Sequence, residues 1–328
     1  MPSSAETPPS PHTLRALARD GVIDAETLER ALVLIRVLPD RSAWRRIIER
    51  TLLALGVVLV LAGVVVFFAY NWDDLLPRYK FALVVAGLLG SVWTAWICWG
   101  KPVGHAASIA ASVLVGVWLG VYGQVYPTGS PWYLLFGLWL VLILGWTVAS
   151  RFAGNWILAI ALANATWVSY STEGMVAFNK ALPFVGVVLI TGAALVVWEA
   201  GIQRGASWLA PRWAPRVLGA ALLFATVSPS LDAIFDVFSH GALQVVAVVL
   251  LAVVCAGMTW YYRRVRPDPM MIAAVFMALI AVGASAIVRA FDASFWGFLV
   301  AAIAVLGGST LAAGWLRKQT IGKEANGA

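Results

Sequence analysis

Charged residues are scarce in this chain, and their scarcity limits the class of protein that it can be. Asp, Glu, Lys and Arg make up 12% of the 328 residues, whereas 61% are hydrophobic. So little polar surface cannot cover the core of a soluble protein of this length, which excludes a set of soluble domains. Cysteine is also scarce, because only Cys98 and Cys255 occur, both inside apolar segments and without metal-binding spacing. We therefore expect neither a disulfide nor a cysteine-bound metal.

The amino-terminal residues lack the pattern of a signal peptide. Residues 1–12 are rich in Pro and Ser and contain no basic stretch followed by an apolar run, so we expect a disordered tail. In residues 13–38 two short helical patterns are separated by Gly21, which can take a left-handed conformation, and Asp24 can cap the second helix. A basic amphipathic stretch follows. We therefore expect residues 13–50 to be a cytoplasmic helical hairpin and an interfacial helix.

Long apolar runs are the main feature that the chain does contain. Residues 51–70 carry no charge, and Arg41, Arg45, Arg46 and Arg50 precede them. Twenty residues at about 1.5 Å each span the roughly 30 Å hydrocarbon core of a bilayer. Because Lys and Arg accumulate on the cytoplasmic side of membrane spans, the arginines place the amino terminus in the cytoplasm. This run is the first predicted transmembrane helix.

Ten such runs predict an all-α, polytopic integral membrane protein of about ten transmembrane helices, with both termini in the cytoplasm. With ten spans, 19 of the 23 Lys and Arg residues fall on the cytoplasmic side and 4 fall outside. The multi-span domain would then cover residues 51–316, and 317–328 would form a cytoplasmic tail. The runs are roughly 51–70, 81–99, 106–125, 132–150, 155–170, 183–200, 216–234, 241–262, 270–289 and 294–315.

Polar side chains at the expected outer ends of the first and third spans suggest a small extracytoplasmic cavity. They are Asn71, Trp72, Asp73, Asp74, Gln124 and Tyr126. All six fall at the same outer level in the predicted topology. A structural role is the alternative for the loop 71–74, because Asn and Asp residues in a turn bond their own backbone and cap the next helix.

Within the spans, ionisable residues are absent from the middle, and Glu199 falls near an inner end. Asn164 and Thr166 are the most central polar pair, and they could bond another helix or contact a substrate. In the third span, Gly116 and Gly120 are spaced for close helix contact.

A spacing of four residues puts Asp232, Asp236 and His240 on one helix face, if the helix continues that far. Two carboxylates and an imidazole could hold a divalent cation or relay a proton. An exposed polar helix end is the alternative, and we favour it. We therefore expect no metal and no cofactor.

Three segments resemble a known family. They are the hairpin turn around Gly21, the loop Ala69-Tyr70-Asn71-Trp72-Asp73-Asp74 that continues to Lys80, and Tyr122-Gly123-Gln124-Val125-Tyr126-Pro127. Together they are similar to the bacterial predicted-membrane-protein family catalogued as domain of unknown function 2157 (DUF2157), over about residues 13–170. The resemblance implies a bacterial cytoplasmic (inner) membrane protein with a cytoplasmic hairpin, and it implies no particular activity.

The sequence leaves three classes of function open. The first is a transporter-like protein that uses the outer cavity as an entrance. The alternative is a membrane scaffold or sensor whose residues 13–38 bind a cytoplasmic protein, and the third is an enzyme built on the face that holds Asp232. The sequence shows no nucleotide-binding loop, no Ser, His and Asp in the order of a catalytic triad, and no nucleic-acid-binding motif. We therefore expect a protein that is not an enzyme, with the lipid bilayer as its environment and no nucleic-acid partner.

Overall fold

The computed structural model describes residues 11–34, 74–127, 129–173, 182–235 and 241–325, with a few single positions between 44 and 66. These residues are helical wherever they are regular, and none of them forms a strand. The chain divides into two compact units, Met1–Leu76 and Pro77–Ala328.

The first unit contains a short helical hairpin. Helix α1, Pro11–Arg19, and helix α2, Ala25–Leu34, pack through Leu14 and Leu32, which are both buried. Gly21 ends the turn after α1 with a φ of 75°, the left-handed conformation that glycine adopts without strain. Asp24 precedes α2, and its carboxylate accepts a hydrogen bond of 3.0 Å from the Thr27 N–H. This is the geometry of a helix N-cap.

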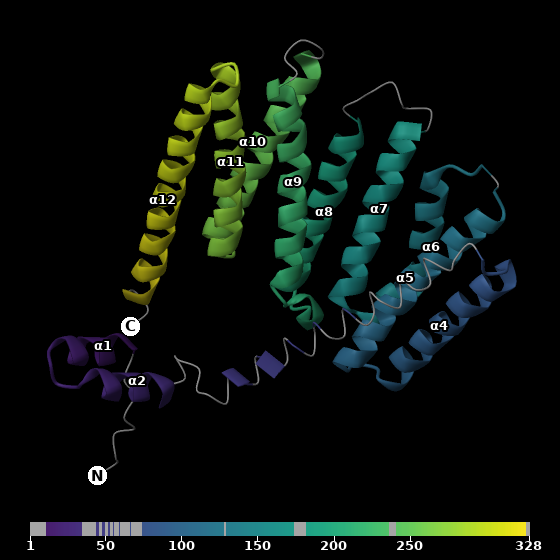
Figure 1. Cartoon of the computed structure of the whole chain (residues 1–328), viewed down its shortest axis with the longest axis horizontal. Coiled ribbons are helices and arrows are strands. Elements are labelled where there is room, and N and C mark those ends of the chain that lie inside the picture. The colour runs from purple at the N-terminus through teal and green to yellow at the C-terminus, as the bar shows by residue number, and fades with distance from the viewer. Residues whose placement is uncertain are drawn as a thin grey trace. The chain divides into compact units, whose positions relative to one another are not determined.

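The second unit consists of long helices, as Figure 1 shows. They are α4 Pro77–Ile97, α5 Pro102–Val125, α6 Trp132–Ser150, α7 Ala153–Glu173, α8 Leu182–Gln203, α9 Trp213–Phe235, α10 Gly241–Arg264, α11 Pro269–Ala290 and α12 Phe295–Ala325, with a short 3-10 helix η1 Ser207–Leu209 before α9.

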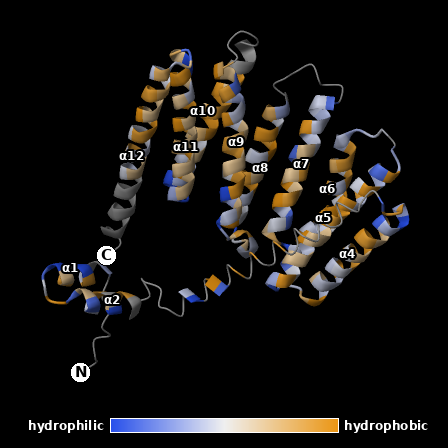
Figure 2. Cartoon of the chain, in the orientation of Figure 1, coloured by the Kyte–Doolittle hydropathy of each residue, from blue (hydrophilic) through white to orange (hydrophobic). Residues whose placement is uncertain are grey.

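Eight of the described helices are long and apolar enough to cross a membrane: α4, α5, α6 and α8 to α12. Figure 2 shows hydrophobic residues along most of their length. The prediction of a polytopic α-helical membrane protein is confirmed, whereas the count of about ten spans is only approximate. The predicted run 155–170 falls within α7, which is 21 residues long but more polar than its neighbours. The predicted first span, 51–70, lies almost wholly outside the described residues.

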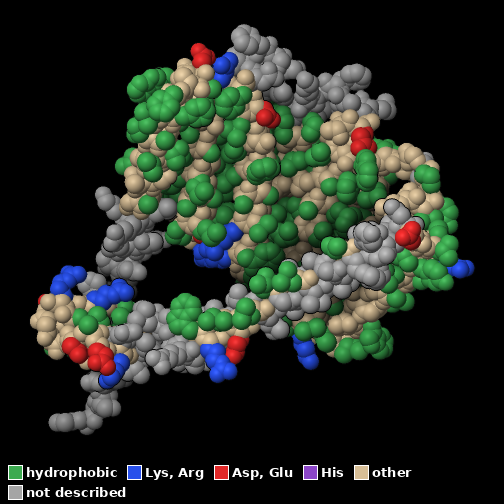
Figure 3. Space-filling view, in the orientation of Figure 1, with side chains coloured by type: hydrophobic (Ala, Val, Ile, Leu, Met, Phe, Trp, Pro, Cys, Tyr) green, Lys and Arg blue, Asp and Glu red, His purple; other side chains and the backbone are tan. Residues whose placement is uncertain are grey.

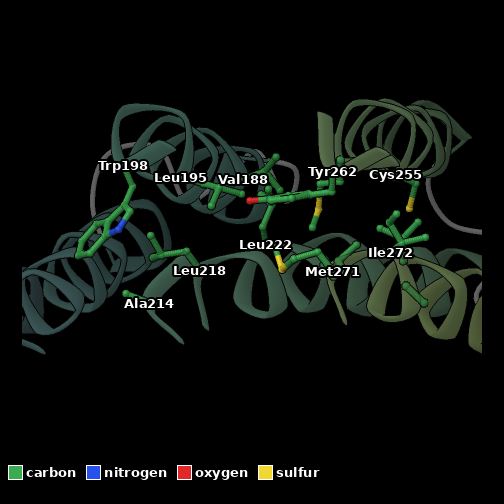
Figure 4. Packing of buried hydrophobic residues seen from close by; sticks show 14 of the residues in the cluster. Val188, Leu195, Trp198, Ala214, Leu218, Leu222, Cys255, Tyr262, Met271 and Ile272 are labelled. Carbon is green, nitrogen blue, oxygen red and sulfur yellow. The ribbon is translucent and has the colours of Figure 1, made fainter. Parts of the chain in front are cut away.

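Helices that follow one another in the sequence pack side by side and antiparallel (Figure 1). In addition, α9 contacts α11 and α7, which makes α9 the central helix of the carboxy-terminal part. One buried apolar cluster lies among α8, α9, α10 and α11, and Figure 4 shows its side chains facing one another. A smaller cluster lies among α5, α6 and α7. Pro229 lies inside α9, which continues past it to Phe235.

Basic residues gather at one end of this unit, called the basic end below. The loops α4–α5, α6–α7, α8–α9 and α10–α11 meet there because neighbouring helices are antiparallel. Among the described residues it carries Lys101, Arg151, Arg204, Arg212, Arg216, Arg263, Arg264 and Arg266. The opposite end carries Arg78, Lys80 and Arg289. Which end faces the cytoplasm stays a prediction.

Candidate functional site

An elongated groove lies between α8, α9 and α10, and its lining is almost entirely apolar. Its volume is about 680 Å³, within the roughly 300–1,000 Å³ that is usual for ligand sites. From α8 it is lined by Val188, Leu195 and neighbouring small residues, and from α10 by Leu250 and Val254. We call it the α8–α10 groove. Such a surface offers dispersion contacts and no hydrogen bond along most of its length.

Two glycines keep this groove open. A Cβ added at Gly192 on α8 would meet only Leu222, at 3.8 Å, and a Cβ at Gly257 on α10 would meet nothing within 4 Å. Both glycines line the groove. The space between α8 and α10 is therefore free for an occupant.

The polar groups of the groove lie together at its basic end. Glu199, on α8, is only 4% exposed. Its Oε1 accepts a hydrogen bond of 2.9 Å from the Tyr262 hydroxyl, and its Oε2 accepts one of 3.3 Å from the Tyr261 hydroxyl. Arg266 donates from Nη1 to the same Oε2 at 2.8 Å. This buried carboxylate is thus paired with one cation and two phenols.

Local structure explains how these groups meet. Gln203 follows Glu199 by one helical turn on α8, so both face α10, and Gln203 Nε2 donates to the Tyr261 hydroxyl oxygen at 2.9 Å. Tyr262 is 3% exposed and fixed in the apolar cluster, as Figure 4 shows. The backbone then folds back after α10, because the Arg266 N–H donates to the Tyr261 carbonyl at 3.1 Å. This turn brings the Arg266 guanidinium to Glu199.

A second ion pair holds the other side of the same loop. Asp268 is 5% exposed, and its carboxylate binds Arg216 through two hydrogen bonds of 3.1 and 3.2 Å. Arg212 Nη1 lies 3.5 Å from it, and the Met270 N–H donates to it at 3.0 Å, which caps α11. Burial alone would raise the pKa of Asp268, but the hydrogen bonds and charge of Arg216, with the Met270 N–H, hold that pKa below its ordinary range.

A separate polar network lies inside the smaller apolar cluster. Asn155, on α7, is fully buried, and its amide donates to Ser108 Oγ on α5 at 2.6 Å. Ser112, one turn further along α5, receives hydrogen bonds from two indoles of α6: Trp146 donates to its Oγ at 2.8 Å and Trp139 to its carbonyl at 2.7 Å. Every group in this network has a partner, so it holds α5, α6 and α7 together.

The two predicted central polar residues lie in different environments. Asn164 donates from Nδ2 to Thr191 Oγ1 on α8 at 3.1 Å and to the Ile160 carbonyl at 3.0 Å. Its Oδ1 is buried without a partner among the described residues. Thr166 donates to the Leu162 carbonyl of its own helix at 2.8 Å. The structure therefore joins Asn164 to α8 and does not join it to Thr166.

Of the residues predicted to line an outer cavity, three are described. Gln124 and Tyr126 lie at the carboxy-terminal end of α5, where both are exposed, and the Tyr126 ring stacks on Phe81 of α4 at 6.5 Å. Asp74 is exposed and belongs to the first unit. Asn71, Trp72 and Asp73 lie outside the described residues. The predicted cavity stays a prediction.

Of the three residues that could hold a metal ion on one helix face, the structure describes one. Asp232 lies exposed in the last turns of α9, whereas Asp236 and His240 lie outside the described residues. In the part of the chain that is described, no group of three or more His, Cys, Asp or Glu side chains is placed to hold a metal ion.

Comparison with known proteins bears on the amino-terminal part of the chain. No curated protein and no solved structure matches the chain. The α8–α10 groove lies beyond the residues that a family model covers, so its interpretation depends on the structure alone. Residues 15–156 match the model of the family described as Predicted membrane protein (DUF2157), which confirms the resemblance of this part of the chain to that family of membrane proteins.

Proposed function

We propose that this membrane protein binds an amphiphilic molecule from the bilayer in the α8–α10 groove. The observation that carries the proposal is the division of the lining: the wall is apolar along α8 and α10, and its hydrogen-bonding groups are gathered at the basic end. An amphiphile has the same division, with a long apolar part and a polar head at one end. Binding, not catalysis, is the activity that we propose.

The polar end also indicates which head group would fit. A carboxylate such as Glu199 only accepts hydrogen bonds, and Arg266 already balances its charge. The described residues that line the groove include no Lys or Arg, so a second anion would meet Glu199 without a further cation to balance it. A head that donates hydrogen bonds, such as a hydroxyl or an amine, can instead bond to Glu199 or to the phenol oxygens of Tyr261 and Tyr262.

The experiment is a thermal-stability series on the purified full chain with single-chain amphiphiles of equal length. Their heads would be hydroxyl, amine, carboxylate and phosphate. A ligand that binds only the folded form raises the melting temperature by mass action. We expect the hydroxyl and amine compounds to raise it and the two anionic compounds to have little effect.

Matched glycine variants locate the binding. Gly257→Leu should remove the stabilisation, because the new side chain enters free space that the ligand would occupy. Gly283→Leu is the control, since Gly283 is also a helical glycine with nothing within 4 Å of an added Cβ, and it lies on α11. Equal stabilisation of both variants would contradict the proposal, as would a series in which the head group makes no difference.

The finer functions expected from the sequence remain proposals. Transport through an outer cavity depends on Asn71 to Asp74, most of which lie outside the described residues. A scaffold or sensor role would use residues 13–38, of which α1 and α2 are described. We also propose that the basic end faces the cytoplasm of a bacterial inner membrane, which the concentration of Arg and Lys there supports.

A further inference from the structure

Two further apolar pockets lie on the other side of α10, on either side of one residue of α11. The first, of about 500 Å³, lies between α10 and Leu279. The second, of about 790 Å³, lies between α11 and α12 and also includes Leu279. Leu279 is 45% exposed and separates the two pockets as a ridge. The surface therefore offers two neighbouring apolar channels.

The first pocket reaches two arginines at the basic end, and the second pocket reaches one of them through Trp315. Arg263 and Arg264, in the last turn of α10, line the first pocket. The Arg263 guanidinium also lies over the indole ring of Trp315, 5.5 Å from its centre, and Trp315 lines the second pocket. Figure 3 shows hydrophobic side chains over α11 and α12 and basic side chains gathered at the lower end of α11.

The charges of these two arginines are not balanced within the described part of the protein. The carboxylates described at the basic end are Glu199 and Asp268. Glu199 is paired with Arg266, and Asp268 is paired with Arg212 and Arg216. Among the described side chains, no carboxylate forms an ion pair with Arg263 or Arg264. An anion is therefore the partner whose charge complements the two arginines.

We propose that Arg263 and Arg264 bind the headgroup phosphate of an anionic phospholipid, whose two acyl chains lie in the pockets on either side of Leu279. Guanidinium groups are well suited to phosphate, because their N–H donors match its oxygens. Basic pockets between transmembrane helices on the cytoplasmic side bind anionic headgroups in this way. The indoles of Trp260 and Trp315 lie at the same end, at the level where tryptophan meets headgroups.

The two pockets distinguish a lipid from a soluble phosphate compound. A soluble anion needs only the arginines, and it would leave apolar channels on both sides of Leu279 exposed. A two-chain lipid fills both channels and places its charge at the point where they converge. This site is distinct from the α8–α10 groove, because apart from Trp260, which lines both, the two sites use different residues of α10, and because it takes an anionic head group.

The test is native mass spectrometry of the purified full chain, titrated with phosphatidylglycerol or phosphatidylcholine of identical acyl chains. We expect wild-type protein to prefer phosphatidylglycerol. The double variant Arg263→Gln and Arg264→Gln should reduce that preference about thirty-fold, the size expected for two arginines at an anionic surface. Arg204→Gln is the control for a general charge effect, since it removes one positive charge from the same end, next to α8, and should leave the preference unchanged.

A second variant tests the acyl channels separately from the charge. Ala256→Trp would fill the pocket between α10 and Leu279 while leaving both arginines in place, and Ala256 is exposed, so the fold should tolerate the indole. Phosphatidylglycerol binding should fall. An equal loss in Arg204→Gln and the double variant would overturn the proposal, as would full displacement of the lipid by excess inorganic phosphate. A dimer whose formation buries Leu279 in place of lipid would also overturn it.

Discussion

At the scale of single residues, Asp268 combines two roles in one carboxylate, because it caps α11 and pairs with Arg216 of α9 and with Arg212 just before that helix. Asp268→Asn keeps the shape of the side chain but removes the charge that Arg212 and Arg216 face. We expect the free energy of unfolding to fall by about 1.5–3 kcal/mol, the usual contribution of hydrogen bonds to charged groups. Denaturant titration in a mild detergent measures it. Asp292→Asn is the control, because Asp292 contacts Arg289 only at 3.5 Å and is exposed.

The lowered pKa of Asp268 also predicts that the stability of the protein depends on pH. The pKa of Asp268 is lowered by folding from its ordinary value of 3.8. A lowered pKa stabilises the folded state fully above the unfolded-state value, and this contribution is lost as pH falls through the folded-state pKa. Wild-type protein should therefore lose stability relative to Asp268→Asn below pH 3.8. A constant difference between the two proteins across that range would contradict the assignment.

Gly116 is a second position where a single added carbon atom would disturb the packing. A Cβ at Gly116 would overlap the indole ring of Trp139, and that ring is held in place by its hydrogen bond to the Ser112 carbonyl. Gly116→Ala should therefore lower the free energy of unfolding by about 1–3 kcal/mol, the usual cost of overpacking. Gly120→Ala is the control on the same helix, because a Cβ there meets nothing within 4 Å. The sequence predicts close helix contact at both glycines, and among the described residues the structure shows it at Gly116.

At the scale of elements, α2 depends on its cap. Hydrogen bonds from the Thr27 side chain and from the Thr27 N–H lower the pKa of Asp24, so the ionised carboxylate is the form that caps the helix. Asp24→Ala should make the amides of the first turn of α2 exchange with solvent about fivefold faster. Hydrogen exchange on the full chain measures this. Asp20→Ala removes a charge from the preceding turn and should leave the exchange rates unchanged.

The helices could be predicted from the sequence to different degrees, and α9 and α7 show why. Apolar length alone identified α9, and Pro229 did not end it, because a bilayer favours continued helix over exposed backbone groups. In α7, Asn155 and Asn164 make the helix more polar than a typical span, and their partners on α5 and α8 satisfy that polarity. A hydropathy sum depends only on residue types and contains no contribution from hydrogen bonds between helices.

The α8–α10 groove could not be predicted in the same way. Glu199 was visible in the sequence as a carboxylate near the end of a span, but its partners Tyr262 and Arg266 follow it by 63 and 67 residues. No local pattern encodes a pairing at that distance. The packing of α8 against α10 brings the three side chains together, and the sequence contains no signal for that packing.

At the scale of the whole molecule, the basic end predicts how the protein is oriented. In a variant with Cys98→Ser and Cys255→Ala, a cysteine introduced at Arg204 should resist a membrane-impermeant thiol reagent in intact cells. A cysteine at Asp292, at the opposite end of the helices, should react. Lysed cells should label both positions. Reaction at position 204 in intact cells would reverse the proposed orientation.

The pairing of Arg216 with Asp268 also has a consequence for how the chain is assembled. Asp268 is synthesised 52 residues after Arg216, once the rest of α9 and all of α10 have been made. During synthesis Arg212 and Arg216 therefore have no partner while α9 and α10 enter the membrane, and their free charge can orient α9. Once α10 has crossed and its loop has returned to the same side, Asp268 pairs with both arginines and balances one of their two charges. Charges that first set the direction of insertion then fasten the finished helices, so the order of synthesis separates the two roles in time.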